Sequence, residues 1–275
     1  MSRDLQFSVL LPVYAGDRAD HFLRAFDSAT VEQELRPSEV ILVQDGPVPG
    51  ALAEAIRSAT AQRHVPVLHH ELPTNVRLAA ALQAGLQRCS YDVIARADAD
   101  DISVPSRFAV QVPLVADGLD LVGSAMQEFD SEDGSLGPIR PRPESTAAIL
   151  RYASFHNPFN HPTVVFRRSA VMAAGGYEDL PFMEDYWLFA RMLAAGATAR
   201  NVREALVRYR TGDELFARRG GWQPLRSDWV LQRRLRRLGL TSRAQMVRNI
   251  AQRTGYRLVP DAIRRWAYPA LIARH

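Results

Sequence analysis

The sequence predicts an α/β protein with a doubly wound, mostly parallel β-sheet and a helical, arginine-rich C-terminal extension. First, short apolar segments alternate with segments of helical periodicity over residues 1–130, which is typical of parallel strands joined by crossover helices. Second, the apolar segments are short and end at turns or polar residues, as buried strands do. Third, arginine is concentrated in residues 200–275.

The order of the expected elements indicates where ligands would bind. Strands are expected at residues 7–13, 40–43, 65–68 and 92–95, with helices at residues 20–34, 52–61 and 78–86. After residue 121 the pattern breaks, and we expect a polar loop at 130–145, helices at 146–154, 168–174 and 185–195, a strand at 163–166, and helices from residue 222 onward. In doubly wound sheets, ligands bind beyond the carboxyl ends of the strands.

Composition favours a globular protein of one domain, or one domain with an appendage. The chain has 275 residues, of which 47% are hydrophobic and 23% charged, as in ordinary soluble domains. Cys89 is the only cysteine, so no internal disulfide can form. No apolar stretch approaches the roughly 20 residues of a membrane span. The N-terminal residues lead directly into a strand without room for a signal peptide, so we expect a cytoplasmic protein.

Charge is distributed unevenly along the chain. Residues 1–199 contain 16 arginines and 25 acidic residues, whereas residues 200–275 contain 18 arginines and 5 acidic residues. The chain contains no lysine, so arginine supplies all 34 of its Lys+Arg charges. The acidic part is suited to hold a cation, and the basic part is suited to an anionic partner.

Two groups of carboxylates are candidates for chemistry. Asp45 follows the second strand, and Asp98, Asp100 and Asp101 follow the fourth. Clustered carboxylates repel one another and suit Mg²⁺ or Mn²⁺ together with substrate phosphates. The alternative is a solvated turn that caps the next helix. The second group, Glu184 and Asp185, could be a general base or an ordinary acidic helix N-terminus.

Together these segments resemble family 2 glycosyltransferases of the GT-A fold, whose sheet is Rossmann-like. The resemblance is closest to the group that builds bacterial capsule, exopolysaccharide and O-antigen. It implies a catalytic domain at 1–215, divided into a nucleotide-sugar-binding half (1–130) and an acceptor-side half (131–215), and a helical basic extension at 216–275. The motifs that carry the resemblance are residues 11–14 (LPVY), 43–47 (VQDGP), 95–103 (ARADADDIS), 157–163 (NPFNHPT), 175–177 (GGY), 183–186 (MEDY) and 218–221 (RRGG).

The resemblance implies a set of donor-binding residues. The nucleoside pocket would be lined by Pro12, Val13 and Tyr14. Asp45 would accept a hydrogen bond from the base, expected to be uracil, and Arg77 would reach the base or a phosphate. The remaining donor contacts would be Asp98 and Ala99 near the ribose, Asp100 as ligand of a Mn²⁺ or Mg²⁺ ion that bridges the diphosphate, and Arg218 and Arg219 as a mobile diphosphate clamp; for this pair a plain surface turn is the alternative.

The resemblance also implies the reaction. Asp185, beside Glu184, would be the catalytic base of an inverting enzyme, which moves glucose or galactose from a UDP-sugar to a hydroxyl of a glycan linked to polyprenyl diphosphate. His161 and Trp187 would contact the acceptor or the donor sugar, although a buried structural role is the alternative for His161. Two positions depart from the family pattern. Arg77 lies in a segment where relatives often carry glycines, and Trp187 stands where relatives commonly have another acid.

The basic tail has two interpretations. Arginines alternate with leucines over residues 231–240, and further arginines precede aromatic and aliphatic residues over 264–272. Such helices can lie on an anionic membrane surface, which would place the protein on the inner face of the plasma membrane, or they can form a solvated cap on the catalytic domain. No recognised nucleic-acid module is present, so no nucleic-acid partner is expected.

Two other functions compete with the transferase. A nucleotidyltransferase would share the acids at the strand ends, but it would normally carry a glycine-rich phosphate loop after the first strand, where this chain has Tyr14, Ala15, Gly16 and Asp17. A non-catalytic nucleotide-sugar-binding or scaffold protein would not need Asp98, Asp100 and Asp185.

Overall fold

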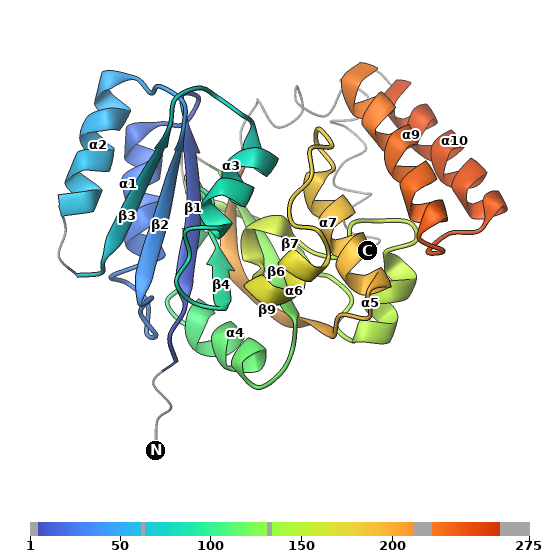
Figure 1. Ribbon diagram of the computed structural model, residues 1–275, viewed down its shortest axis with the longest axis horizontal. Helices are drawn as coiled ribbons and strands as arrows, with labels where there is room; N and C mark the ends of the chain where they lie inside the picture. The colour runs from blue at the N-terminus through green and yellow to red at the C-terminus, as the bar shows by residue number, and fades with distance from the viewer. Residues whose placement is uncertain (1–4, 62–63, 131–133, 212–221, 259–275) are drawn as a thin grey trace.

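A computed structural model describes residues 5–61, 64–130, 134–211 and 222–258 of the chain (Figure 1). The strands are β1 (Ser8–Tyr14), β2 (Glu39–Asp45), β3 (Val67–Leu72), β4 (Val93–Arg96), β5 (Ile102–Ser103), β6 (Leu121–Asp130), β7 (Leu136–Arg140), β8 (Val165–Arg167) and β9 (Ala199–Thr211). The helices are α1 (Ala19–Ser28), α2 (Gly50–Ala61), α3 (Leu78–Leu86), α4 (Arg107–Ala116), α5 (Thr146–Tyr152), α6 (Arg168–Ala173), α7 (Glu184–Ala194), α9 (Trp222–Arg237) and α10 (Arg243–Leu258), with a 3₁₀ turn η1 (His161–Thr163).

The strands form one sheet in the order β3-β2-β1-β4-β8-β6-β9-β5, with β7 paired to β6. The N-terminal strands β3, β2, β1 and β4 are parallel, as the alternation of strands and helices predicts. Antiparallel β8 joins them to the second half of the sheet, in which β6 and β9 are again parallel. The expected α/β class with a doubly wound sheet is therefore confirmed.

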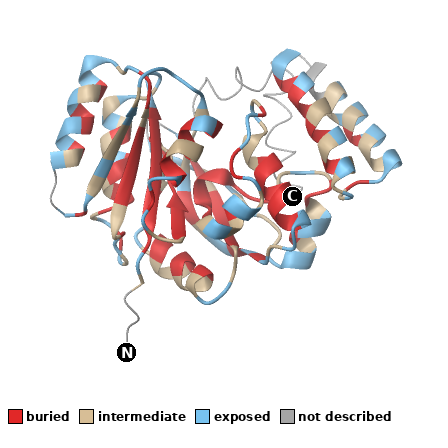
Figure 2. Cartoon of the chain, in the orientation of Figure 1, coloured by how far each residue is buried: buried red, intermediate tan, exposed pale blue. Residues whose placement is uncertain are grey.

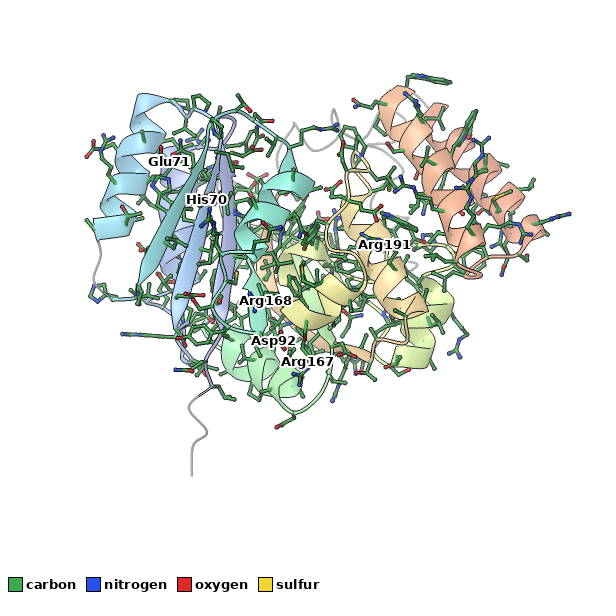
Figure 3. The ribbon with its side chains drawn as sticks, viewed as in Figure 1. His70, Glu71, Asp92, Arg167, Arg168 and Arg191 are labelled. Carbon is green, nitrogen blue, oxygen red and sulfur yellow. The ribbon has the colours of Figure 1, made fainter. Side chains whose placement is uncertain are left out.

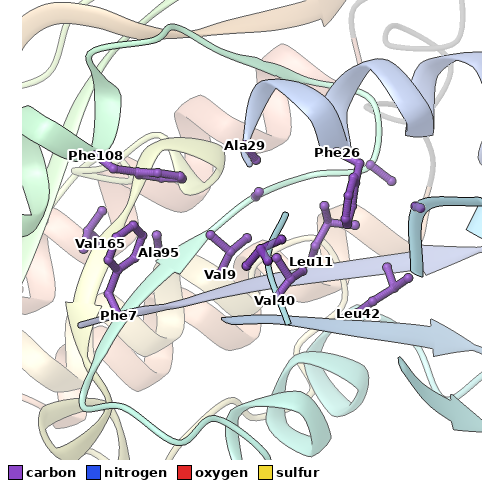
Figure 4. Packing of buried hydrophobic residues seen from close by; sticks show 14 of the residues in the cluster. Phe7, Val9, Leu11, Phe26, Ala29, Val40, Leu42, Ala95, Phe108 and Val165 are labelled. Carbon is purple, nitrogen blue, oxygen red and sulfur yellow. The ribbon is translucent and has the colours of Figure 1, made fainter. Parts of the chain in front are cut away.

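Alternate residues of the central strands pack against opposite layers of helices. Val9 and Leu11 of β1 belong to one apolar cluster, whereas Leu10 belongs to the other. Figure 4 shows the first cluster, in which Phe26 of α1 and Phe108 of α4 cover this face. A strand buried on both faces reads as a continuous apolar run, which is why the short apolar segments of the sequence predict these strands. Figure 2 shows the resulting buried sheet with exposed outer helix faces.

The described part of the C-terminal extension is helical, as expected. Helices α9 and α10 pack on each other and lie at the end of the molecule opposite α2 and β3 (Figure 1). Leu231 and Leu235 of α9 share a third apolar cluster with Tyr186 and Trp187 of α7. The extension is thus docked on the helix that begins with the acidic pair. In the part of the chain that is described, no helix has the length and apolar character needed to cross a membrane.

Several expected boundaries differ from the structure. The helix expected at 20–34 ends at Ser28. The loop expected at 130–145 contains β7, whose Ile139 pairs with Gln127 of β6 although its own side chain is 51% exposed. Strands β6 and β9 were not expected from the sequence, because β9 in particular mixes buried positions with exposed charged ones. The expected boundary at residues 215 and 216 lies outside the described residues.

Candidate active site

The carboxyl ends of β1 and β2 lie side by side. Tyr14 is in register with Asp45, and Leu10 of β1 is in register with Arg96, the last residue of β4. The parallel arrangement therefore brings Asp45 and the acidic run after β4 to one edge of the sheet. Of the expected nucleoside-pocket residues, Val13 is buried and Tyr14 is 37% exposed.

Asp45 is fixed by the loop that precedes α3. Its Oδ1 accepts a hydrogen bond from the backbone N of Val76 at 2.7 Å, and its Oδ2 accepts one from Asn75 Nδ2 at 3.0 Å. Gly46 adopts φ +83°, and a Cβ there would lie 2.6 Å from the backbone N of Asn75. Each carboxylate oxygen can accept two hydrogen bonds, so both oxygens of Asp45 retain capacity for a ligand.

Arg77 directly follows this loop and adopts an unusual backbone conformation. Its φ of 73° and ψ of 159° lie in a region populated almost only by glycine. The family pattern often has glycines in this segment. Its side chain is 48% exposed, and its Nη1 lies 3.3 Å from Oδ2 of Asp179. Arg77 therefore connects the start of α3 to the segment before α7.

The acidic run after β4 forms a compact cluster. Carboxylate oxygens of Asp98, Asp100 and Asp101 lie within 4.8 Å of one another. Asp98 is ion-paired with the buried guanidinium of Arg96. Asp101 is buried, and its Oδ1 accepts a hydrogen bond from the backbone N of Arg210 at 2.9 Å. Burial and the neighbouring charges of Asp100 and Asp98 raise the pKa of Asp101 well above its ordinary value.

This cluster fits a divalent cation. The Oδ2 of Asp101 is buried and has no hydrogen-bond partner among the described residues, and a buried carboxylate oxygen without a partner is costly. Three carboxylates at this spacing are hard oxygen ligands of the kind that Mg²⁺ and Mn²⁺ take. The alternative of a solvated helix cap is contradicted, because Asp101 is buried and α4 begins only at Arg107.

The second acidic pair begins α7. Oδ2 of Asp185 accepts a hydrogen bond from Asn157 Nδ2 at 2.7 Å, and its Oδ1 accepts one from the backbone N of Tyr186 at 2.6 Å. Burial raises the pKa of Asp185, although these two hydrogen bonds oppose the rise. Burial and the charge of Asp185 raise the pKa of Glu184 to about 7. Asn157 lies in a motif that carries the family resemblance, but its contact with the expected base could not be foreseen from spacing.

Helix α7 is held in place by a buried arginine on its own C-terminal half. The two terminal nitrogens of Arg191, labelled in Figure 3, donate to the backbone carbonyls of Ala174 and Gly176, both at 2.6 Å. The same guanidinium lies 5.2 Å from the centre of the Trp187 ring. Arg191 therefore anchors the glycine turn before α7 and thereby fixes the position of the acidic pair.

The two expected sugar contacts are both buried and bonded to protein groups. Nε2 of His161 lies 3.1 Å from the hydroxyl of Tyr177, and burial holds the pKa of His161 well below its ordinary value. The indole of Trp187 donates to Glu178 Oε2 at 2.7 Å, and the guanidinium of Arg234 lies 5.0 Å from its ring centre. In this structure Trp187 thus links α7 to α9. The expected diphosphate clamp, Arg218 and Arg219, lies outside the described residues.

A pocket of about 310 Å³ opens beside Asp185. It is lined by Arg142, Tyr152, His156, Asn157, Phe182, Met183, Asp185, Tyr186 and Arg253. Except for Asp185, none of these residues was among the expected site residues; Phe182, Met183 and Tyr186 flank Asp185, whereas Arg142, Tyr152, His156, Asn157 and Arg253 come from segments distant in sequence. The pocket is the space in which a second substrate could approach the carboxylate.

Comparison with known proteins identifies the family of this chain. The model of the family described as glycosyl transferase family 2 matches residues 8–175. The amylovoran biosynthesis glycosyltransferase AmsE of Erwinia amylovora is 34% identical over 265 residues, which are 95% of this chain and 97% of that protein. The UDP-Gal:alpha-D-GlcNAc-diphosphoundecaprenol beta-1,3-galactosyltransferase of Escherichia coli is 33% identical over 271 residues, which are 98% of this chain and 97% of that protein.

Solved structures share the fold at low sequence identity. TarS 1–349 of S. aureus in complex with UDP-GlcNAc has a TM-score of 0.65 and 12% identity, over 90% of this chain and 71% of that one. The mannosyltransferase PcManGT of Pyrobaculum calidifontis in complex with GDP-Man and Mn²⁺ has a TM-score of 0.65 and 15% identity, over 98% of this chain and 81% of that one. The fold is the expected GT-A fold. Because the family model matches more than half of the chain and the Escherichia coli relative aligns with nearly all of it, this chain belongs to glycosyltransferase family 2.

Proposed function

We propose that this chain is a metal-dependent, inverting glycosyltransferase of bacterial surface polysaccharide biosynthesis, such as capsule or O-antigen. It moves a hexose, glucose or galactose, from a UDP-sugar to a hydroxyl of a glycan acceptor carried on polyprenyl diphosphate. The observation that carries the proposal is the buried guanidinium of Arg96, whose charge acts on both acidic groups, the cluster after β4 and the pair at the start of α7. It is ion-paired with Asp98, and its charge also opposes the raised pKa values of Glu184 and Asp185.

The donor nucleotide would lie along the edge formed by β1, β2 and β4. Pro12, Val13 and Tyr14 line the nucleoside side, and Asp45 accepts a hydrogen bond from the uracil. A UDP donor is supported by the Escherichia coli relative, which uses UDP-Gal, and by the structural neighbour TarS, which is in complex with UDP-GlcNAc. Arg77, Ala99, Arg218 and Arg219 complete the proposed donor contacts.

Asp100 would hold the divalent cation, with Asp98 directed to the ribose. A cation held there would supply positive charge to stabilise the diphosphate leaving group. Mn²⁺ is present in the mannosyltransferase neighbour. In this chain the charge of Arg96 compensates Asp98, and the backbone of Arg210 holds Asp101, so the loop that carries Asp100 is fixed before the ligand arrives.

Asp185 would take the proton of the attacking acceptor hydroxyl. Asn157 orients its carboxylate, and burial raises its pKa toward the value that suits proton transfer near neutral pH. Attack from the side opposite the leaving diphosphate inverts the anomeric centre. Glu184 supports this role as its neighbour, and His161 and Trp187 act at the walls of the sugar site.

The proposed acceptor is supported by one of the relatives, and the proposed location rests on that acceptor. A galactosyltransferase that aligns with nearly all of the chain acts on a sugar linked to diphosphoundecaprenol. A lipid-linked acceptor makes contact with the inner face of the plasma membrane useful, and the arginines of α9 and α10 are suited to an anionic surface. Pelleting with anionic liposomes tests this contact, and a protein that stays in the supernatant would remove it.

The proposed activity is tested by a donor screen. The purified protein is incubated with Mn²⁺ or Mg²⁺ and a panel of nucleotide sugars, and release of nucleoside diphosphate is measured. We expect slow UDP release from one sugar, abolished by EDTA and by Asp100→Ala. Absence of both hydrolysis and a thermal shift with every nucleotide sugar would contradict the donor site. Loss of turnover in Asp185→Ala, with donor binding retained, would separate the enzyme from a scaffold.

A further inference from the structure

Two arginines from distant parts of the chain line the pocket beside Asp185. Arg142 precedes α5, whereas Arg253 lies on α10 of the C-terminal extension. The volume of about 310 Å³ is at the lower end of the range for small-molecule sites. The charge of Asp185 acts on Arg142. The pocket therefore combines the proposed base with cationic groups that the donor site does not use.

Arg142 is half-buried and has few partners among the described residues. Its Nη1 donates to the carbonyl of the adjacent Pro141 at 3.1 Å, and its Nε is buried without a partner among the described residues. Arg96 and Arg191 also have a buried Nε without a partner, but each is ion-paired with a carboxylate. No such ion pair involves Arg142 in the described ranges, and burial lowers the pKa of its guanidinium.

Arg253 forms the rigid side of the pocket. Its Nη1 lies 2.7 Å from Oδ1 of the buried Asp228, and its Nη2 donates to the carbonyl of Phe155 at 2.7 Å. These contacts tie α10 to the segment that carries Asn157. Arg253 is therefore held in position before a ligand binds, while its charge is compensated by Asp228. Of these two cations, Arg142 is the one without a direct ion pair to a carboxylate among the described residues.

The apolar side chain of Phe182 also lines this pocket. Phe182 is 47% exposed and adopts φ 67°, a conformation that is uncommon for a bulky residue. Its backbone conformation places an aromatic ring at a pocket that also contains cations and a carboxylate. An aromatic surface beside guanidinium groups suits a ligand that has an anionic group next to a hydrocarbon chain.

We propose that this pocket binds the diphosphate of a prenyl-diphosphate-linked acceptor, with Arg142 as the principal contact and Arg253 as a fixed second cation. This inference rests on the proposed function and names the subsite for its acceptor. A guanidinium offers two parallel donors to phosphate oxygens. The acceptor sugar lies between the diphosphate and Asp185, and Phe182 contacts the first carbons of the lipid.

The experiment measures binding of geranyl diphosphate, a short prenyl diphosphate, by isothermal titration calorimetry in the presence of EDTA. We expect the wild-type chain to bind it and Arg142→Gln to weaken the binding by roughly 10- to 100-fold, because a charge-assisted hydrogen bond is lost. Arg151→Gln is the matched control, since it removes the same charge from an exposed position of the adjacent helix α5, and it should bind as the wild type does. Excess UDP should leave the binding unchanged.

Three results would overturn the subsite: no binding to the wild type, equal binding to Arg142→Gln, or displacement of geranyl diphosphate by UDP. Titration of UDP with Mn²⁺ is a separate readout. Retained UDP binding in Arg142→Gln would show that the variant is folded, so that its loss of geranyl diphosphate supports the subsite. If UDP with Mn²⁺ fails to bind the wild type, the donor site of the proposed function falls, whereas binding of geranyl diphosphate that depends on Arg142 still supports the anion subsite.

Discussion

The proposed donor edge, formed by the carboxyl ends of β1, β2 and β4, and the proposed acceptor pocket beside Asp185 are built in different ways. At the donor edge, the acidic residues directly follow parallel strands of the sheet; Asn75 and Val76 hold Asp45, and Arg96 pairs with Asp98. In the acceptor pocket, Asp185 instead lies at the start of helix α7 and is held by Asn157, from the segment after α5. The rest of the pocket lining comes from the segment around Asp185 itself, from Arg142, from residues 152–157 and, on the C-terminal extension, from Arg253.

The difference indicates which part of the site each sequence change affects. A parallel sheet fixes the donor edge through backbone pairing, so its geometry tolerates loss of a single side chain. The acceptor pocket depends on side-chain hydrogen bonds between elements that the sheet does not join directly. Changes in the acceptor pocket should therefore alter the reaction step and acceptor use while donor binding is preserved.

The largest effect is expected for Asp185→Asn. This change keeps the shape of the side chain but removes the base, so kcat should fall by roughly 10²- to 10⁴-fold, while the Kd for UDP with Mn²⁺ stays unchanged. The measurement combines sugar transfer under donor saturation with calorimetric titration of UDP. Glu184→Gln is the matched control because it removes a carboxylate from the same helical turn, and it should cost at most about tenfold. Equal loss in both variants would contradict the assignment of Asp185 as the base.

A smaller effect is expected for Asn157→Ala. The hydrogen bond from Asn157 lowers the pKa of Asp185, so its loss raises that pKa further. Asp185 must be ionised to act, and the acid limb of the pH profile of kcat should therefore move to higher pH, with a loss of about tenfold at neutral pH. Asn157→Asp should shift the limb further, because it adds a like charge. An acid limb that stays in place in both variants would show that Asn157 does not hold the base.

Sequence reasoning located the donor edge because its strands are short, apolar and buried on both faces. The helix expected at residues 78–86 is found as Leu78–Leu86, and Asp45 and the cluster after β4 lie at the expected edge. These features depend on local pattern and on one rule about parallel sheets.

The acceptor pocket could not be predicted in the same way. One support of the donor edge escapes local pattern as well: the 13-residue strand β9 alternates too irregularly to be recognised, and it carries Arg210, whose backbone N donates to Asp101. Arg142 and Arg253 are ordinary surface-like arginines in the sequence, and only the packing of α10 on the segment around Phe155 brings them to one pocket. Such a site is formed by tertiary contacts that leave no local periodicity.

Glu184→Gln should also stabilise the protein in a pH-dependent manner. The folded-state pKa of Glu184 is about 7, raised from 4.5 by burial and by Asp185. The folded protein therefore binds this proton more tightly than the unfolded chain, and stability is lost as pH rises from 4.5 to 7. The variant should gain about 1–2 kcal/mol in free energy of unfolding above that range, after allowance for solvent screening of a part-exposed group.

Urea unfolding at several pH values measures this gain for Glu184→Gln. The gain should disappear near pH 4, where the carboxyl group is protonated in both the folded and the unfolded chain. Glu204→Gln is the matched control, because it makes the same substitution at an exposed position of β9, and the pH-dependent gain should be confined to Glu184→Gln. A gain that is the same at all pH values would mean that the proton of Glu184 is not its cause.

The smallest effect concerns Arg77, which connects the two regions through its ion pair with Asp179. Arg77→Ala and Arg77→Gly both remove the ion pair, but only glycine relieves the backbone conformation at φ 73°. Glycine should therefore exceed alanine by about 1 kcal/mol in free energy of unfolding, measured by urea titration. If Arg77 contacts the donor, both variants should weaken UDP binding equally, because both lack the guanidinium. A loss of UDP affinity in Arg77→Ala alone would mean that this position serves the donor edge through its backbone conformation and not through its charge.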